Sequence, residues 1–142
     1  MNRQKSMLEM QVKLSTLWIF YLFNGFFRDL HEFVEPGFLE QAMTGTFNGI
    51  EITEQLLLFG GFVAAVPISM VLFSRLLPYG ANRWANIIAA VITLAFEINN
   101  GTNDLDDTFH MVMEMAALSL IIWSAWRWRN PAPKSYSPVQ EA

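Results

Sequence analysis

Four apolar segments dominate the pattern of hydrophobic and polar positions along the chain. The longest, Gln55 to Ser74, runs for twenty residues without a charged side chain. At about 1.5 Å per residue, a helix of that length spans the roughly 30 Å hydrocarbon core of a bilayer. The other apolar runs are Leu14 to Phe27, Trp84 to Phe96 and Met115 to Trp126. Each of these three is too short to cross a bilayer unless polar residues at one end belong to the helix.

Including those polar residues gives four predicted transmembrane helices, at residues 14–33, 54–77, 82–100 and 104–127. We therefore expect an all-α, polytopic membrane protein whose four-helix transmembrane bundle occupies residues 14–128. Residues 1–13 are predicted to form a cytoplasmic N-terminal segment. The Pro-rich residues 129–142 are predicted to form a disordered cytoplasmic tail. This assignment places ionisable groups at membrane depth.

The distribution of charge predicts the orientation of these helices. Of the nine Lys and Arg residues, eight fall on one side of the predicted spans, and Arg28 is the exception. The opposite side collects acidic residues, which are Asp29, Glu32, Glu35, Glu40, Glu51, Asp104, Asp106 and Asp107. Because positively charged loops stay in the cytoplasm, both termini are predicted to be cytoplasmic.

Composition supports a membrane protein and excludes several other classes. Charged residues make up 15% of the chain, whereas about a quarter is usual in a soluble domain. The mean hydropathy of +0.28 does not separate the two classes, because it averages apolar runs with polar loops. The chain has no cysteine, which excludes disulfides, thiolate metal sites and cysteine nucleophiles. The sequence also has no phosphate-binding glycine loop, nucleophile elbow or basic surface for nucleic acid, so no nucleic-acid partner is expected.

The longest predicted loop, Phe33 to Thr53, is acidic but not uniformly polar. Pro36 predicts the start of a short helix, because proline is favoured in the first helical turn. Such a helix has an apolar face made of Phe38, Leu39, Ala42 and Met43. We expect this segment to lie as a lid on the outer membrane interface.

Polar side chains recur on one face of several predicted helices at about 100° per residue. The residues that share a face within their helix are Asn24, Arg28, His31 and Glu35; Asn86, Thr93, Glu97 and Asn100; and Asp107, His110 and Glu114. An isolated charge in hydrocarbon costs on the order of 3 kcal/mol, so these faces are expected to point inward around an outward-facing polar cavity. The candidate ligand-binding residues are Arg28, His31, Glu54, Glu97, His110 and Glu114. Since carboxylates outnumber the one permanent cation, a small cation, a proton or a polar ligand is the favoured occupant.

Two alternatives stay open for these polar residues. In the first, they only join helices by hydrogen bonds and ion pairs, and the protein is a structural partner of another membrane subunit or a homodimer. In the second, His110 and Glu114 act as an acid–base pair on a lipid-soluble substrate. Small residues in the second predicted helix suggest a surface for close helix packing, formed by Gly60, Gly61, Ala64, Ala65 and Ser69.

A divalent metal is a further hypothesis. His110 and Glu114 are spaced i, i+4, and His31 lies on the neighbouring predicted helix. Imidazole and carboxylate are suitable ligands for zinc and similar ions. The sequence therefore suggests His31, His110 and Glu114 as a candidate metal site.

Four segments together resemble an uncharacterised family of small bacterial membrane proteins with four helices. They read RDLHEFVEPGFLEQAMTG, ITEQLLL, SRLLPYGANRWANI and NGTNDLDD. More distantly, the layout of a first helix followed by a Pro-Gly-Phe segment and three further spans is similar to the DoxX-like superfamily. The first resemblance implies a bacterial cytoplasmic (inner) membrane, and the second implies a quinone as a conceivable cofactor or partner.

Overall fold

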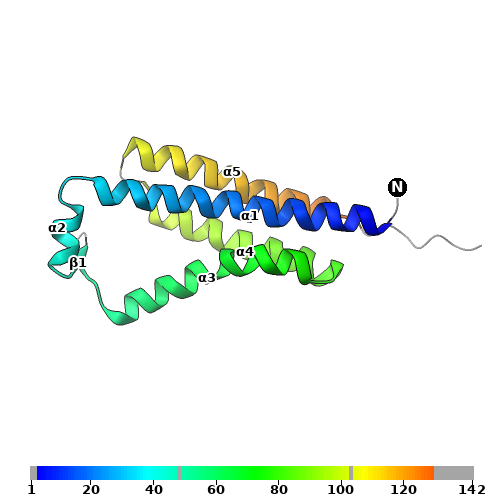
Figure 1. Cartoon of the computed structure of the whole chain (residues 1–142), viewed down its shortest axis with the longest axis horizontal. Helices are drawn as coiled ribbons and strands as arrows, with labels where there is room; N and C mark the ends of the chain where they lie inside the picture. The colour runs from blue at the N-terminus through cyan, green and yellow to red at the C-terminus, as the bar shows by residue number, and fades with distance from the viewer. Residues whose placement is uncertain (1–2, 48, 103, 130–142) are drawn as a thin grey trace, which may run out of the picture.

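The computed structural model describes residues 3–47, 49–102 and 104–129, and these residues form four long helices, one short helix and a small hairpin (Figure 1). In chain order the elements are α1 (Arg3–Val34), α2 (Phe38–Met43), β1 (Thr46–Phe47), β2 (Ile50–Glu51), α3 (Glu54–Leu76), α4 (Tyr79–Asn100) and α5 (Leu105–Arg127). The predicted all-α class is thereby confirmed. The antiparallel hairpin, in which Thr46 pairs with Glu51, was not predicted. The predicted tail, residues 129–142, lies outside the described residues except for Arg129.

The four long helices form a closed cycle of contacts. Helix α1 packs against α3 and α5, and α4 packs against the same two helices. In Figure 1, α1 and α5 run alongside each other, whereas α3 diverges from α1 toward the end at which α3 begins. The backbones of α1 and α3 are therefore farther apart at that end of the molecule than at the other (Figure 1).

Local chemistry sets the ends of these helices. Thr53 caps α3 by accepting a hydrogen bond from the Leu56 backbone N–H, and Asp104 caps α5 by accepting one from the Asp107 backbone N–H. Gly101 ends α4 with a φ of 69°, a conformation that favours glycine. Helix α1 begins at Arg3. The N-terminal segment that was predicted to precede the first membrane span is therefore helical from Arg3 onward.

A buried hydrogen-bond network joins α1, α3 and α4 near the α3–α4 turn. Trp18 Nε1 donates to Asn86 Oδ1 at 2.8 Å, and Ser74 Oγ donates to the same oxygen at 3.0 Å. Asn86 Nδ2 donates to Asn82 Oδ1 at 2.7 Å, and Asn82 Nδ2 donates to the Ser74 carbonyl at 2.7 Å. All of these side chains are buried. Because such groups are costly to leave unpaired, this network fixes the closed end of the helix assembly.

The outer surfaces of the long helices are largely apolar. Of the most apolar stretch of α3, only 11% is buried, and Leu57, Leu58 and Phe62 are each more than 60% exposed. The other long helices expose further large apolar side chains, among them Phe23, Phe26, Ile88, Ile92, Val112 and Trp123. Within the described residues, α3 and α5 are long and apolar enough to cross a membrane, judged by length and composition.

Candidate binding cavity

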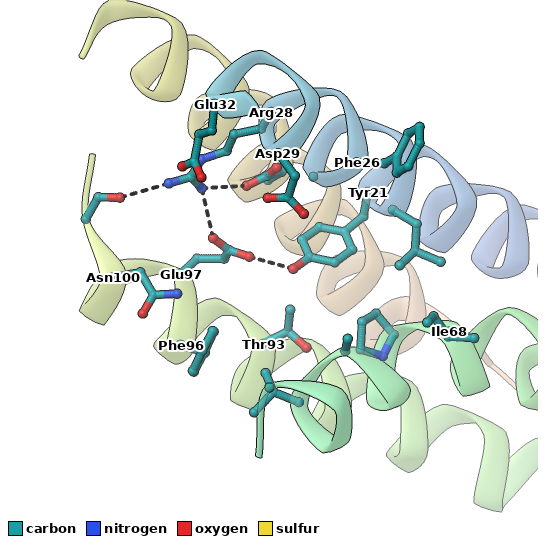
Figure 2. Close-up of a pocket in the computed structure, with 18 of the residues that line it drawn as sticks. Tyr21, Phe26, Arg28, Asp29, Glu32, Ile68, Thr93, Phe96, Glu97 and Asn100 are labelled. Atoms are coloured by element: carbon teal, nitrogen blue, oxygen red, sulfur yellow. Dashed lines mark hydrogen bonds and ion pairs between the residues drawn. The ribbon is translucent and has the colours of Figure 1, made fainter. Parts of the chain in front are cut away.

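Arg28 of α1 is the centre of a buried ion-pair cluster. Its Nε lies 3.0 Å from Asp107 Oδ1 on α5, and its Nη1 lies 3.3 Å from Glu97 Oε2 on α4. The same Nη1 is 3.5 Å from Glu114 Oε2 on α5. Nη2 donates to the Gly101 carbonyl at 3.1 Å, which ties the α4–α5 turn to the cluster (Figure 2). A single guanidinium therefore joins three helices, as its planar fork of donors permits.

Glu97 and Glu114 differ in how fully their oxygens are satisfied. Glu97 Oε1 accepts a hydrogen bond of 2.6 Å from the Tyr21 hydroxyl, so both of its oxygens have partners, and Figure 2 shows it between Tyr21 and Arg28. Glu114 is 1% exposed, and its Oε1 has no hydrogen-bond partner within the described residues. The Glu114 carboxyl is therefore only half satisfied, which is unusual for a buried charged group.

The local shape of α1 makes room for the unpaired oxygen of Glu114. A Cβ atom added at Gly25 would lie 3.5 Å from Glu114 Oε1. Both residues line a cavity of about 720 Å³ between the helices. Glu114 is thus a lining residue of the cavity, although its unpaired oxygen is itself enclosed by neighbouring atoms.

This cavity has two unlike walls. The charged wall comes from α1, α4 and α5, and its ionisable side chains are Arg28, Asp29, Glu32, Glu97 and Glu114. The facing wall comes from α3 and consists of Gly60, Val63, Ala64, Pro67 and Ile68. Aromatic side chains of Tyr21, Phe26 and Phe96 also line the cavity (Figure 2). Ile50 of the hairpin lines the cavity as well, so the loop predicted as a lid reaches it through β2.

The charge of the cavity is predominantly acidic. One arginine faces four carboxyl groups among the lining residues. Asp107, which does not line the cavity, already holds the Nε of that arginine. Because this wall has more carboxyl groups than arginine side chains, it can bind a cationic ligand or a ligand with several hydrogen-bond donors.

The small residues of α3 are not closely packed by another described helix of this chain at Gly60 and Gly61. A Cβ atom added at Gly60 or Gly61 would have no heavy atom within 4 Å among its possible neighbours. Gly60 and Ala64 line the cavity instead. Within the described part of this chain no helix packs closely on Gly60 or Gly61, because α3 diverges from α1 where these residues lie. Packing of this surface against a second protein stays a prediction.

Three of the six predicted ligand-binding residues meet at the cavity, namely Arg28, Glu97 and Glu114. Glu54 does not join them. It is exposed at the first turn of α3, and its side chain makes no hydrogen bond or ion pair among the described residues. The divergence of α3 from α1 carries this end of the helix away from the cluster.

His31 and His110 form a separate cluster with a different carboxylate from the one predicted. His31 Nδ1 lies 2.6 Å from Asp106 Oδ2, and the rings of His31 and His110 are 5.6 Å apart. Glu114 was the predicted third metal ligand, but it pairs with Arg28. The correction follows from helix geometry, because Asp106 and His110 are also spaced i, i+4, toward the start of α5.

Sequence reasoning missed two residues that the structure brings into these clusters. Tyr21 lies seven residues before Arg28 on the same face of α1, so its position was available from the helical period. Asp106 was counted only among the acidic residues on the outer side of the predicted spans, although its spacing to His110 placed it on the same face. Neither spacing alone reveals which partner on another helix completes the contact.

Outside the long helices, the carboxyl groups of Glu35 and Asp104 lie close enough to interact. This contact raises the pKa of Glu35, whereas the pKa of Asp104 is lowered mainly by the hydrogen bond from the Asp107 backbone N–H. The contact links the segment after α1 to the start of α5.

The structure thus defines an all-α protein with an acidic cavity between its long helices. The chain belongs to a family of unknown function (DUF6326), whose family model matches residues 5–134. The predicted membership of an uncharacterised family is confirmed by this match. No curated protein and no solved structure matches the chain.

Proposed function

We propose that this protein is a four-span integral protein of a bacterial cytoplasmic membrane, with both termini in the cytoplasm. The support is the extensive apolar surface, which a soluble monomer does not expose on this scale. Helices α1 and α4 also expose large apolar side chains, although polar residues interrupt their apolar runs. Arg28 and Glu97, two of the polar residues that shorten these apolar runs, lie in a largely buried contact with each other rather than on the outer surface.

The proposed function of the cavity is to bind a small cationic ligand, or a polar ligand that donates hydrogen bonds. The observation that carries this proposal is the half-satisfied carboxyl of Glu114, which is a lining residue of a cavity where carboxyl groups outnumber the arginine. Aromatic faces near an organic cation add a favourable interaction of about 0.5–2 kcal/mol. Tyr21, Phe26 and Phe96 supply such rings in the same cavity.

The ligand is proposed to enter from the outer side of the membrane. Arg28 contacts the Gly101 carbonyl in the α4–α5 turn, and Ile50 of the hairpin lines the cavity. Both segments lie on the acidic side of the chain, which the distribution of Lys and Arg places outside. The cavity therefore belongs to the outer half of the proposed bundle.

The test compares a charged and an uncharged probe on the purified full-length protein in detergent. Titration calorimetry with tetraethylammonium is expected to give binding, and uncharged tert-butanol is expected to give none. Glu114→Gln should weaken tetraethylammonium binding at least tenfold. The matched control is Glu40→Gln, because Glu40 is an exposed carboxylate on α2 that does not line the cavity. Equal affinity of the Glu114→Gln variant and the control would contradict a cation site at Glu114.

The apolar α3 wall favours a second candidate, a lipid-soluble ligand such as a quinone, with its polar head near Arg28 and its body against Val63 and Ile68. If this candidate is right, the protein should bind decylubiquinone. A larger side chain at position 60 in place of Gly60 should weaken that binding, whereas Glu114→Gln should leave it unchanged. The same pair of variants therefore separates the two candidates. The structural-partner alternative predicts that neither probe binds.

A further inference from the structure

A second group of ionisable residues lies beside the cavity cluster and is not needed for it. His31 follows Arg28 by three residues on α1, and Asp106 and His110 lie on α5. Each of the three offers one ligand atom, and these atoms lie within 4.8 Å of one another. Two neighbouring helices thus bring two imidazoles and one carboxylate to a common point.

His110 is the most informative member of this group. Its side chain is only 10% exposed, yet its Nδ1 has no hydrogen-bond partner within the described residues. Its Nε2 lies 3.9 Å from Asp106 Oδ1, which is too long for a hydrogen bond. In the part of the chain that the structure describes, neither ring nitrogen is hydrogen-bonded. The Nε2 atom, which faces Asp106, is therefore available to coordinate an ion, whereas Nδ1 is the buried nitrogen without a partner among the described residues.

The accessibility of the other two residues explains how an ion would enter. The side chains of His31 and Asp106 are 52% and 44% exposed. The cluster is therefore closed on the His110 side and open to solvent on the other. A ligand set of this kind leaves at least one coordination position for water.

The distances are compatible with coordination after small side-chain rotations. Zinc binds imidazole nitrogen and carboxylate oxygen at about 2.0–2.2 Å, so neighbouring ligand atoms in a tetrahedral site lie about 3.4 Å apart. His31 Nδ1 and Asp106 Oδ2 are already closer than this, at 2.6 Å, and His110 Nε2 must approach Asp106 from 3.9 Å. Both adjustments are small, and the exposed Asp106 side chain can make them by rotating.

From this geometry we propose that His31, Asp106 and His110 form a binding site for a divalent transition-metal ion of the zinc type, which joins α1 to α5. Two imidazoles favour such ions over magnesium and calcium, which take oxygen ligands. The site goes beyond the proposed cavity function, since none of its three residues lines the cavity. Its bound ion fastens the two helices that carry Arg28 and Asp107.

The experiment uses full-length protein without an affinity tag, purified in detergent without chelator or metal resin. Elemental analysis after incubation with zinc and gel filtration is expected to give one zinc per chain. Titration calorimetry should show a zinc affinity at least tenfold lower in His31→Ala and in Asp106→Asn, as expected for the loss of one ligand. Glu40→Gln and Glu114→Gln should keep the wild-type zinc affinity. Magnesium should not bind at the same concentrations.

A visible absorption spectrum with cobalt(II) tests directly whether these residues coordinate the ion. Cobalt(II) bound to the wild-type protein should give the visible absorption of a nitrogen- and oxygen-ligated ion, and this spectrum should change in His31→Ala. Because His110 is buried and its substitution can affect folding, the decision rests on the exposed residues His31 and Asp106. Zinc binding that is unchanged in both of these variants, or that is substoichiometric in the wild type, would overturn the proposal.

The two proposals fail separately. Loss of tetraethylammonium binding in Glu114→Gln with unchanged zinc binding supports the cavity function and leaves the metal site intact. Loss of zinc binding in Asp106→Asn with unchanged tetraethylammonium binding supports the metal site alone.

Discussion

Arg28 on α1 and Glu114 on α5 face each other with Nη1 and Oε2 3.5 Å apart, and the second oxygen of Glu114 has no partner within the described residues. The same arginine makes shorter contacts with Asp107 and Glu97. Glu114 is therefore the least tightly held carboxylate of the cluster and also the most buried, at 1% exposure. Because of this combination, the Glu114 carboxyl is the group of the cluster best suited to bind a ligand in place of its contact with Arg28.

Removing Arg28 should destabilise the protein more than removing any one carboxylate. Arg28→Met leaves Glu97, Asp107 and Glu114 without their shared cation, and breaking a buried ion pair in this way costs about 3–5 kcal/mol. Thermal unfolding in detergent should show a large drop in midpoint for this variant. Glu114→Gln should lower stability much less, by about 1 kcal/mol, because the amide keeps the shape and one acceptor oxygen. Equal losses in the two variants would show that Arg28 depends on Glu114 alone.

Substitutions at Gly60 should separate filling the cavity from packing the helices. Gly60→Ala should be neutral or stabilising by up to about 1 kcal/mol, because the added methyl meets no neighbour and alanine favours a helix. Gly60→Leu should project bulk into the cavity and weaken ligand binding at least tenfold. Gly61→Leu is the control, since Gly61 does not line the cavity. A destabilising Gly60→Ala would restore the packing interpretation of this surface.

The Trp18–Asn86 hydrogen bond should contribute to stability independently of the cavity. Trp18→Phe removes the indole donor but leaves Ser74 bonded to Asn86 Oδ1, so the hydrogen-bond loss is expected to be about 0.5–1.5 kcal/mol, with a further loss from the smaller ring. Chemical unfolding followed by circular dichroism measures the total. Tetraethylammonium affinity at 25 °C should be unchanged, because neither Trp18 nor Asn86 lines the cavity. A change in affinity would mean that the two ends of the assembly are coupled.

The proposed topology predicts the location of the chain ends and of the α4–α5 turn. A reporter that is active only in the cytoplasm should give signal when fused to either terminus, and no signal when inserted after Gly101. The reason is that eight of nine Lys and Arg residues lie on the side of the termini. A cytoplasmic signal from the insertion after Gly101 would exclude the four-span arrangement.

The sequence by itself determined the helices, because their signals are local. The apolar run that contains Pro67 predicted α3, and Thr53 and Gly101 mark helix ends through their own side-chain or backbone chemistry. The helical period also placed Glu97 and Glu114 on buried faces, as the structure shows. The short helix after Pro36 was predicted for the same reason, although it begins at Phe38.

Only the tertiary structure decided which polar residues meet. The rotation and divergence of α3 relative to α1 removed Glu54 from the cluster and turned Gly60 toward a cavity. The offset between α1 and α5 along their axes joined His31 to Asp106 and left Glu114 with Arg28. A helical period fixes the angle of a side chain around its own axis, but partner choice depends on the relative height and tilt of two helices, and these are set by packing along their whole length.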